Sequence, residues 1–339
     1  MATMKEIAEL AGVSRGTVDR VLNHRGIVNE NTEKKVQEIA RLLDYQPNRA
    51  GKALAAQKKK FQIGVILFGS DNPFFDEVME GMYKKFEELS IYGCSIQERR
   101  IHFTLEAQLQ AIDELVRGGI DGIILSPYND AAIQEKIDEL FEREIPCVTI
   151  NTDIPHSKRI AYVGSDYYKC GETAAGLLGL ITGGQALVGI VTGSHNVLCH
   201  EERIEGFMDR VQQKYPGIQV ASIVENQDDE YISFNMVRRL LKNNPNITAL
   251  YFTAAGVHGG CQAITAMEIK SPIRVISFDA VASTKLMMRE GLVTATITQQ
   301  PLQQGADSLS ILVDYLLTRS LPPQELNYMD LSIMIEENI

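Results

Sequence analysis

The chain has 339 residues and an acidic balance, with 33 Lys and Arg against 44 Asp and Glu, and 45% of its residues are hydrophobic. This length suits two or three domains with a large core. Because no run of about 18 apolar residues occurs and charged residues interrupt the N-terminus, we expect neither a membrane span nor a signal peptide. The five cysteines are scattered without a CxxC pair, which favours reduced thiols in a cytoplasmic protein over a disulfide framework or a zinc site.

The first 43 residues have the pattern of three short helices. Thr3 caps the first helix, and Glu6, three positions later, completes a capping box. Gly12 ends this helix in a short turn, after which Ser14 caps a second helix and Asn29 begins a third. A turn of three to four residues between the first two helices is typical of a helix-turn-helix, whose second helix enters the DNA major groove.

A three-helix bundle that binds no nucleic acid is the alternative, and two observations argue against it. The second helix keeps Arg15, Thr17 and Arg20 on the side away from its apolar residues. Residues 1–60 hold 12 Lys and Arg against 7 Asp and Glu, whereas the remainder holds 21 against 37. A basic head on an acidic body indicates an anionic partner at that end. Arg15 and Arg20 are candidates for guanine contacts, with phosphate contacts as the alternative.

The head resembles that of a LacI/GalR-family transcriptional regulator in two runs, AELAGVSRGTVDRVLN and YQPNRAGKALA, and the similarity continues through the remaining chain. In that family the two positions after the capping serine read bases. Here they are Arg15 and Gly16, so half of the reading pair lacks a side chain. The resemblance implies that the DNA-contacting residues are Thr3, Ser14, Arg15, Gly16, Thr17, Arg20, Asn23, His24, Asn48, Arg49, Lys52 and Leu54.

The segment from Gln46 to Lys60 joins this head to the remaining chain. Pro47 stops the third helix, and Asn48 is placed to cap a short helix from Arg49 to Ala56 that buries little by itself. The resemblance implies a hinge helix that pairs across a dimer and inserts Leu54 into the minor groove. A plain flexible linker is the alternative.

From residue 61 onward, short apolar runs alternate with amphipathic stretches, a pattern typical of parallel sheets. One set contains IGVILF, GIILSP, CVTIN and YVGSD, and a second contains ALVGIVTG, VASIVEN, ALYFT, IRVISFD and ATITQ. We therefore expect an α/β protein with an N-terminal all-α helix-turn-helix head at residues 1–46, a hinge and linker at 47–60, and two Rossmann-like parallel-sheet lobes within 61–339.

The resemblance to type 1 periplasmic binding proteins, which bind sugars, implies how these lobes are connected. The chain is expected to cross between lobes three times, near Gly164, Gly291 and Pro323. The lobes would then comprise about 61–163 with 292–322, and about 164–291 with 323–339. This arrangement places a ligand cleft between the lobes.

Ligands of open α/β sheets lie beyond the carboxyl ends of the strands, where this sequence places polar residues. Asn151, Asp166, Asp279 and Gln299 each follow an apolar run, and Arg203 begins a helix after the VTGSHN loop. Aspartates beside a donating arginine suit a sugar or polyol. Segments similar to ribose-type binding proteins, namely NPFF, ERIEGF, SFDA and TITQQP, point to the same pocket. The full set is Asn72, Phe74, Phe75, Asn151, Asp166, Arg203, Asp279 and Gln299.

These residues have structural alternatives, and the pocket departs from its template. Asp166 and Asp279 are also placed to cap the helices that follow their strands, and Phe74 to fill the core. Thr152 stands where ribose-type proteins have an arginine, and Ala255–Gly256 replaces an asparagine–aspartate pair. The loss of these polar groups argues against ribose and favours a larger or less hydroxylated ligand. Further contacts are expected from His195, His200 or His258.

These observations favour a ligand-responsive transcriptional regulator. By resemblance it is a repressor of carbohydrate-related genes that binds a pseudo-palindromic operator as a homodimer. The alternative is a regulator whose ligand is a nucleoside or another small metabolite and acts as a corepressor. GxGxxG and P-loop motifs are absent, and the GVSRG run of the predicted helix-turn-helix does not follow a strand as a GxSxG nucleophile elbow does. The sequence therefore does not support an enzyme, and we expect no cofactor. His195, His200 and Glu201 lack a standard ligand spacing, so we expect no metal. The DNA-reading head argues against a transport protein.

Overall fold

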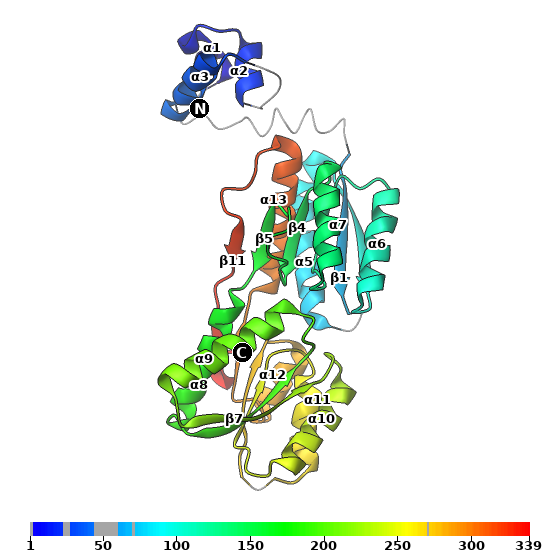
Figure 1. Ribbon diagram of the computed structural model, residues 1–339, viewed down its shortest axis with the longest axis vertical. Coiled ribbons are helices and arrows are strands. Elements are labelled where there is room, and N and C mark those ends of the chain that lie inside the picture. Colours follow the sequence, from blue (N-terminus) through cyan, green and yellow to red (C-terminus); the bar gives the residue numbers. More distant parts are fainter. Residues whose placement is uncertain (1–2, 23–27, 44–59, 70–71, 270) are drawn as a thin grey trace.

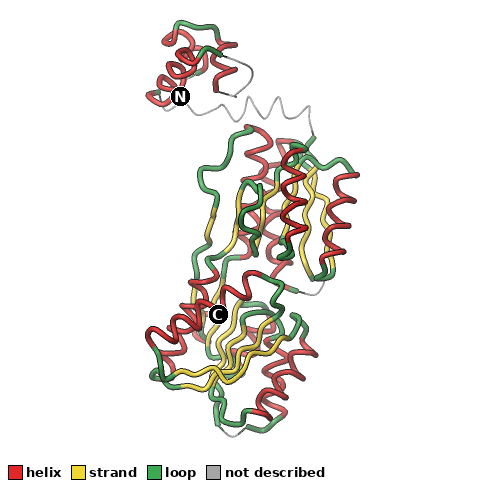
Figure 2. The backbone as a smooth tube through the Cα atoms, viewed as in Figure 1, coloured by secondary structure: helices red, strands yellow, loops and turns green. Residues whose placement is uncertain are grey.

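A computed structural model describes residues 3–22, 28–43, 60–69, 72–269 and 271–339. It has a small helical head and a body of two lobes, each built around one sheet (Figure 1). Helices flank the strands of both lobes on either face (Figure 2). Head and two-lobed body agree with the expected α/β fold class.

The head contains α1 (Met4–Ala11), α2 (Arg15–Leu22) and α3 (Glu30–Leu42). The capping box is confirmed, because the Thr3 backbone N–H donates to the Glu6 carboxylate (2.7 Å) and the Glu6 N–H donates to Thr3 Oγ1 (3.3 Å). Gly12 adopts the left-handed conformation (φ 69°) that ends α1. Ile7, Val18 and Val36 are fully buried, one from each helix, and form the centre of the head's core.

Part of the expected DNA-binding apparatus lies outside the described residues. The predicted helix at 49–56 belongs to this part, as do the predicted contact residues Asn23, His24, Asn48, Arg49, Lys52 and Leu54.

The first lobe is a six-stranded sheet in the order β11-β5-β4-β3-β1-β2, in which all neighbouring strands pair in parallel. Its strands are β1 (Gln62–Phe68), β2 (Ser95–Ile101), β3 (Gly122–Leu125), β4 (Cys147–Asn151), β5 (Ala161–Gly164) and β11 (Leu326–Tyr328). One face packs against α5 (Pro73–Leu89) and α13 (Pro301–Thr318), and the other against α6 (Leu105–Arg117) and α7 (Ala131–Glu142). The short 3-10 helix η1 (Ser90–Tyr92) follows α5.

The second lobe is a six-stranded sheet in the order β12-β10-β9-β8-β6-β7, parallel except that β12 runs antiparallel to β10. Its strands are β6 (Ala186–Thr192), β7 (Ile218–Glu225), β8 (Ala249–Phe252), β9 (Arg274–Phe278), β10 (Ala295–Thr298) and β12 (Ser332–Met334). One face packs against α8 (Tyr167–Thr182) and α9 (Leu198–Lys214), and the other against α10 (Glu230–Asn243), α11 (Val257–Ala266) and α12 (Ala282–Arg289). The 3-10 helix η2 (Glu336–Asn338) follows β12.

The chain crosses between lobes three times, but two crossings differ from the expected positions. The first follows β5, near Gly164, as expected. The second lies at residues 299–300 and not near Gly291, because β10 pairs with β9 in the second sheet. The third lies at residues 329–331 and not near Pro323, because β11 pairs with β5 in the first sheet. The expected lobe boundaries at 292 and 323 are therefore wrong.

The sequence pattern does not predict the strand β2. It reads SIQERRI, and its four central polar residues hide the alternation that marks a strand. It lies at the edge of the sheet beside β1, so its charged side chains remain partly exposed. Among the described residues, no helix combines the length and the apolar character needed to cross a membrane.

Candidate functional site

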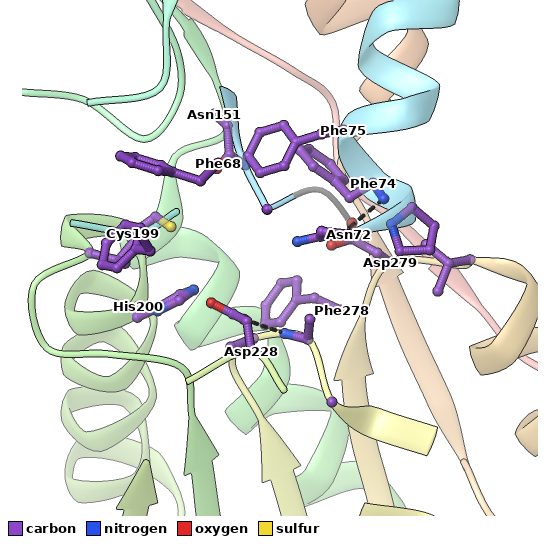
Figure 3. A pocket seen from close by; sticks show the side chains of 18 of the residues that line it. Phe68, Asn72, Phe74, Phe75, Asn151, Cys199, His200, Asp228, Phe278 and Asp279 are labelled. Carbon is purple, nitrogen blue, oxygen red and sulfur yellow. Dashed lines mark hydrogen bonds between the residues drawn. The ribbon is translucent and has the colours of Figure 1, made fainter. Parts of the chain in front are cut away.

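A cavity of about 450 Å³ lies between the two lobes and takes its walls from both. Figure 3 shows Phe68, Asn72, Phe74, Phe75 and Asn151 of the first lobe facing Cys199, His200, Asp228, Phe278 and Asp279 of the second. Most of these residues follow the carboxyl ends of parallel strands or begin the helices that come next. The cavity therefore lies where the strand pattern predicted a ligand site.

Aromatic rings form much of the first-lobe wall. The rings of Phe68 and Phe103 meet edge to face with centroids 4.5 Å apart, and Phe103 and Tyr128 are 4.9 Å apart. Phe74 and Phe75 also pack edge to face, at 5.2 Å. Phe74 and Phe75 belong to the buried core and also line the cavity. Phe74 is therefore both a core residue, which was the structural alternative, and a residue of the cavity wall. An apolar wall of this kind suits the face of a sugar ring or another flat ligand.

Asp279 and Gln299 form a hydrogen-bonded pair on the second-lobe side. Gln299 Nε2 donates to both carboxylate oxygens of Asp279, at 2.9 and 3.1 Å. Burial raises the pKa of Asp279 to about 6, although Arg203 and the Gln299 hydrogen bond both act to lower it. The other amide atom of Gln299, Oε1, is buried and has no partner. The pair thus presents two carboxylate acceptors and one unused amide acceptor.

Arg203 lies within α9 and not at its start, because α9 begins at Leu198, directly after the loop. Its side chain is 3% exposed and lines the cavity. Nη1 donates to the backbone carbonyl of Thr253 (2.5 Å), and the guanidinium lies 3.8 Å from the ring centroid of Phe278 and 4.7 Å from that of Tyr167. Its Nε and Nη2 groups are buried and have no hydrogen-bond partner.

The two predicted asparagines line the cavity and also shape the backbone around it. Asn72 caps α5, with Oδ1 accepting from the Phe74 N–H (3.1 Å). Asn151 has a left-handed backbone (φ 65°), and its Nδ2 donates to the Tyr167 hydroxyl (3.1 Å). This last bond joins the end of β4 to the start of α8, one element from each lobe.

Asp166 does not line the cavity. It directly precedes α8 and caps it, with Oδ1 accepting from the Lys169 N–H (3.0 Å) and Oδ2 3.2 Å from Lys169 Nζ. The capping alternative is therefore the correct one for this residue. The structure brings the other seven predicted residues together around the cavity, and their ligand contacts remain predictions.

The structure adds lining residues that the sequence did not single out or named only as options. His200 lines the cavity, whereas His195 and His258 do not. Its ring is buried, which lowers its pKa below the usual value, and Nδ1 lies 3.3 Å from both the backbone nitrogen and the carbonyl oxygen of Ser194. Asp228 also lines the cavity, and its position shortly after β7 was a signal available in the sequence.

The positions that differ from ribose-type binding proteins lie in the cavity wall, whereas His195 lies outside it. Thr152, Ala255 and Gly256 line the cavity, so the replacements noted in the sequence do alter its wall. His195 instead pairs with Glu201 and with Glu225 Oε1 (3.0 Å). No group of three His, Cys, Asp or Glu side chains able to hold a metal ion occurs within the described part of the chain.

The head presents its predicted recognition residues to solvent. Arg15, Gly16 and Arg20 are exposed on α2, while Val18 and Val21 face the core. Ser14 caps α2 by accepting from the Thr17 N–H (3.1 Å). Arg20 Nε donates to the Gly16 carbonyl (3.2 Å), which holds its side chain along the helix surface. The exposed face of α2 is therefore polar and basic, as a major-groove helix requires.

Comparison with known proteins agrees with both parts of this architecture. Residues 3–48 match the family described as "Bacterial regulatory proteins, lacI family", and residues 63–319 match "Periplasmic binding protein domain". The probable HTH-type transcriptional repressor ExuR of Bacillus subtilis is 30% identical over 287 residues, which cover 82% of each chain. The chain belongs to the lacI family of regulators.

Two other proteins are similar to this lacI-family regulator, one over nearly its full length and one over its two-lobed body. The ribose operon repressor of Halalkalibacterium halodurans is 26% identical over 332 residues, covering 95% of this chain and 92% of that protein. The body resembles the crystal structure of GanP, a glucose-galactose binding protein from Geobacillus stearothermophilus, with a TM-score of 0.77 and 25% identity. That match covers 83% of this chain and 99% of GanP. The expected family, fold class and transcriptional-regulator class are thus confirmed.

Proposed function

We propose that this lacI-family regulator is a repressor of carbohydrate-related genes, released from its operator by a sugar or sugar derivative bound between the lobes. It acts in the cytoplasm as a homodimer, and its two-fold symmetry requires a pseudo-palindromic operator. The carrying observation is that one chain joins a helix-turn-helix head to a two-lobed body whose cleft holds Arg203, Asp279 and Gln299. The names of its relatives, a ribose operon repressor and a glucose-galactose binding protein, support this ligand class.

The mechanism follows from the position of the cleft. A ligand that contacts both lobes favours the arrangement in which both sets of contacts form, and it shifts the equilibrium only by its differential affinity for the two arrangements. The linker leaves the body at residue 60, just before β1 of the first lobe. A change in how the lobes of a dimer meet therefore changes the spacing of the two heads.

The experiment selects binding sites for the full-length protein from a random duplex library, followed by anisotropy titrations on the enriched sequence. We expect a pseudo-palindrome, and a panel of sugars, sugar derivatives and nucleosides should contain a compound that weakens binding. Arg15→Ala should weaken binding to the selected sequence by about 5- to 150-fold and relax one base position in each half-site. Failure to enrich any sequence would overturn the proposal. An equal loss by Arg15→Ala on selected and random DNA would make Arg15 a phosphate contact.

A further inference from the structure

The charged groups that a ligand can reach in the cavity are carboxylates. Four acidic side chains line it, namely Asp228, Asp229, Glu230 and Asp279. Arg203 is the one Lys or Arg among the described residues of the wall, and its Nε and Nη2 are shielded from water while its guanidinium stacks on Phe278. A cleft lined by one sign of charge concentrates ligands of the opposite sign, so this cavity favours a cationic group over an anionic one.

Asp228 differs from its acidic neighbours in what its carboxylate does. Asp229 caps α10 by accepting from the Ile232 N–H (2.7 Å), and Glu230 accepts from the Gly259 N–H at the start of α11. Asp228 precedes α10, and its Oδ1 accepts from the Ala255 N–H (2.9 Å). Its Oδ2 makes no hydrogen bond or ion pair within the described part of the chain, and its side chain is exposed to the cavity. The carboxylate is thus held in position by one oxygen and leaves the other for a ligand.

His200 adds a second acceptor in the same wall. Its side chain is 6% exposed, and Nε2 has no hydrogen-bond partner among the described residues but is not shielded from water. Burial lowers the pKa of the imidazole, so the ring is neutral at pH 7. When Nδ1 carries the proton and donates to the Ser194 carbonyl, Nε2 accepts a hydrogen bond. Because buried polar groups are normally partnered, an unpartnered Nε2 directed at a cavity indicates a ligand contact.

Gly193 brings these two side chains to the same point. A Cβ on Gly193 would lie 2.5 Å from His200 Cε1 and 2.7 Å from Asp228 Oδ2, so a larger residue would push both away. Figure 3 shows His200 and Asp228 beside each other on the second-lobe side of the cavity. Two neighbouring acceptors, one of them charged, suit a donor group with several N–H bonds and a positive charge. A protonated primary amine has three such bonds.

The rest of the wall suits a sugar ring that carries this amine. The first lobe contributes the rings of Phe68, Phe74 and Phe75, and an aromatic face attracts a cation and also packs on the apolar face of a sugar. Ser126 of the first lobe and Thr284 of the second line the cavity and are each 1% exposed. Neither hydroxyl makes a hydrogen bond within the described residues, and neither is shielded from water. Both are therefore available to the hydroxyl groups of a ligand.

We propose that the effector is an amino sugar whose protonated amine donates to Asp228 Oδ2 and His200 Nε2. Asp228 is then the residue that determines the ligand class. This rests on the proposed function in that the cleft binds a sugar derivative, and it specifies that derivative by a charge that neutral sugars lack. A cavity of about 450 Å³ holds a six-carbon amino sugar with room for bound water.

The test compares matched ligands on the full-length protein at pH 7 by calorimetry and thermal shift. The sets are glucose, glucosamine and N-acetylglucosamine, and the same three forms of galactose and mannose, with glucuronate as an anion. At least one amine should bind about 10-fold or more tightly than both its neutral parent and its N-acetyl form, since acetylation removes the charge.

Two variants assign this preference to its residues. Asp228→Asn keeps an acceptor for the Ala255 N–H and removes the charge, so it should lower the affinity for the amine to that for the neutral parent. His200→Ala should reduce the preference. The matched control is Asp166→Asn, which removes a carboxylate outside the cavity and retains a capping side chain for α8; it should leave the preference unchanged.

The outcomes separate this proposal from the proposed function. If a neutral sugar or glucuronate binds as tightly as every amine, the amino-sugar assignment is overturned while sugar-responsive regulation stands. An amine preference that persists in Asp228→Asn would overturn the role of Asp228. If the protein binds its operator but none of these sugars, the ligand class itself fails. Operator binding and circular dichroism of Asp228→Asn show whether the variant is folded, so a loss of amine binding in a folded variant counts.

Discussion

At the scale of single residues, Asp279 shows how the cleft holds a charge at a cost. It follows β9 in a left-handed backbone conformation (φ 64°), which aspartate and asparagine tolerate better than most residues. Burial raises its pKa to about 6, above the value of 3.8 for an exposed aspartate. The folded protein therefore binds this proton at higher pH than the unfolded chain does. Ionised Asp279 lowers the free energy of unfolding above pH 6, and this cost fades as the pH falls from 6 towards 4.

The replacement Asp279→Asn tests that cost. Asparagine keeps the backbone conformation and an acceptor for Gln299, and its amide can donate to the unpartnered Gln299 Oε1. At pH 8 the variant should be more stable than wild type by about 2–3 kcal/mol, and the difference should shrink as the pH is lowered from 6 towards 4. Urea unfolding at several pH values measures it. A difference that does not vary with pH would show that Asp279 does not titrate as proposed.

Asp166 and Asp279 also show the limit of sequence interpretation at this scale. Each follows an apolar run, so the sequence assigned both to the pocket. Asp166 stands directly before α8 and caps it, whereas two residues separate Asp279 from α12 and leave its carboxylate to Gln299. The difference depends on where a helix begins, to within one or two residues, and propensity does not resolve that.

At the scale of elements, close helix packing sets the position of α9. A Cβ on Gly206 would lie 2.0 Å from the Tyr168 carbonyl oxygen, and one on Gly171 would lie 2.2 Å from the Arg203 carbonyl oxygen. The backbones of α8 and α9 therefore touch where these glycines stand. Because Arg203 and His200 belong to α9, this contact determines how far both side chains reach into the cavity.

The replacement Gly206→Ala should separate these helices. The added methyl meets a backbone oxygen, which cannot move aside without shifting α8, so we expect a loss of about 1–3 kcal/mol and weaker effector binding. The control is Gly176→Ala in α8, where a Cβ meets nothing within 4 Å. This change should stabilise the protein by about 0.5–1 kcal/mol. Thermal unfolding and effector calorimetry measure both variants; equal effects of the two would contradict the packing argument.

The sequence predicts long elements better than short ones, for a physical reason. All nine predicted strands are present, and all except β7 bury a run of at least three residues. β2 escaped detection because an edge strand tolerates the charges of QERR. The second and third lobe crossings were misplaced because β10, β11 and β12 have only three or four residues each. The sheet that such a short strand joins is decided by its partner strand and not by its own pattern.

At the scale of the whole molecule, hydrogen bonds across the cleft hold the lobes together. The Asn129 N–H of the first lobe donates to the Asn196 carbonyl of the second (3.2 Å). Asn151 Nδ2 reaches the Tyr167 hydroxyl (3.1 Å), and the Cys199 N–H lies 3.4 Å from Thr152 Oγ1. Few and weak contacts of this kind suit an equilibrium that a ligand can shift.

A reversible cross-link at the Asn129–Asn196 contact tests whether this rotation is the switch. The Asn129 nitrogen lies 3.2 Å from the Asn196 carbonyl oxygen, so the two backbones are in direct contact across the cleft, as a disulfide between these positions requires. In the double variant N129C/N196C, oxidation should fix the lobes in one arrangement. Operator affinity should then no longer change when the effector is added, and reduction should restore the response.

The native cysteines should not interfere with this cross-link. Cys147, Cys170, Cys199 and Cys261 are buried, and burial raises the pKa of the half-buried Cys94 thiol to about 11, so few thiolates are available to compete. The single variant N129C, oxidised in parallel, controls for modification at that site. If the oxidised double variant still responds to the effector, lobe rotation is not the switch, and the signal must reach the heads by another route. If it does not respond, its fixed operator affinity identifies which arrangement binds DNA, because the cross-linked form holds the lobes in contact.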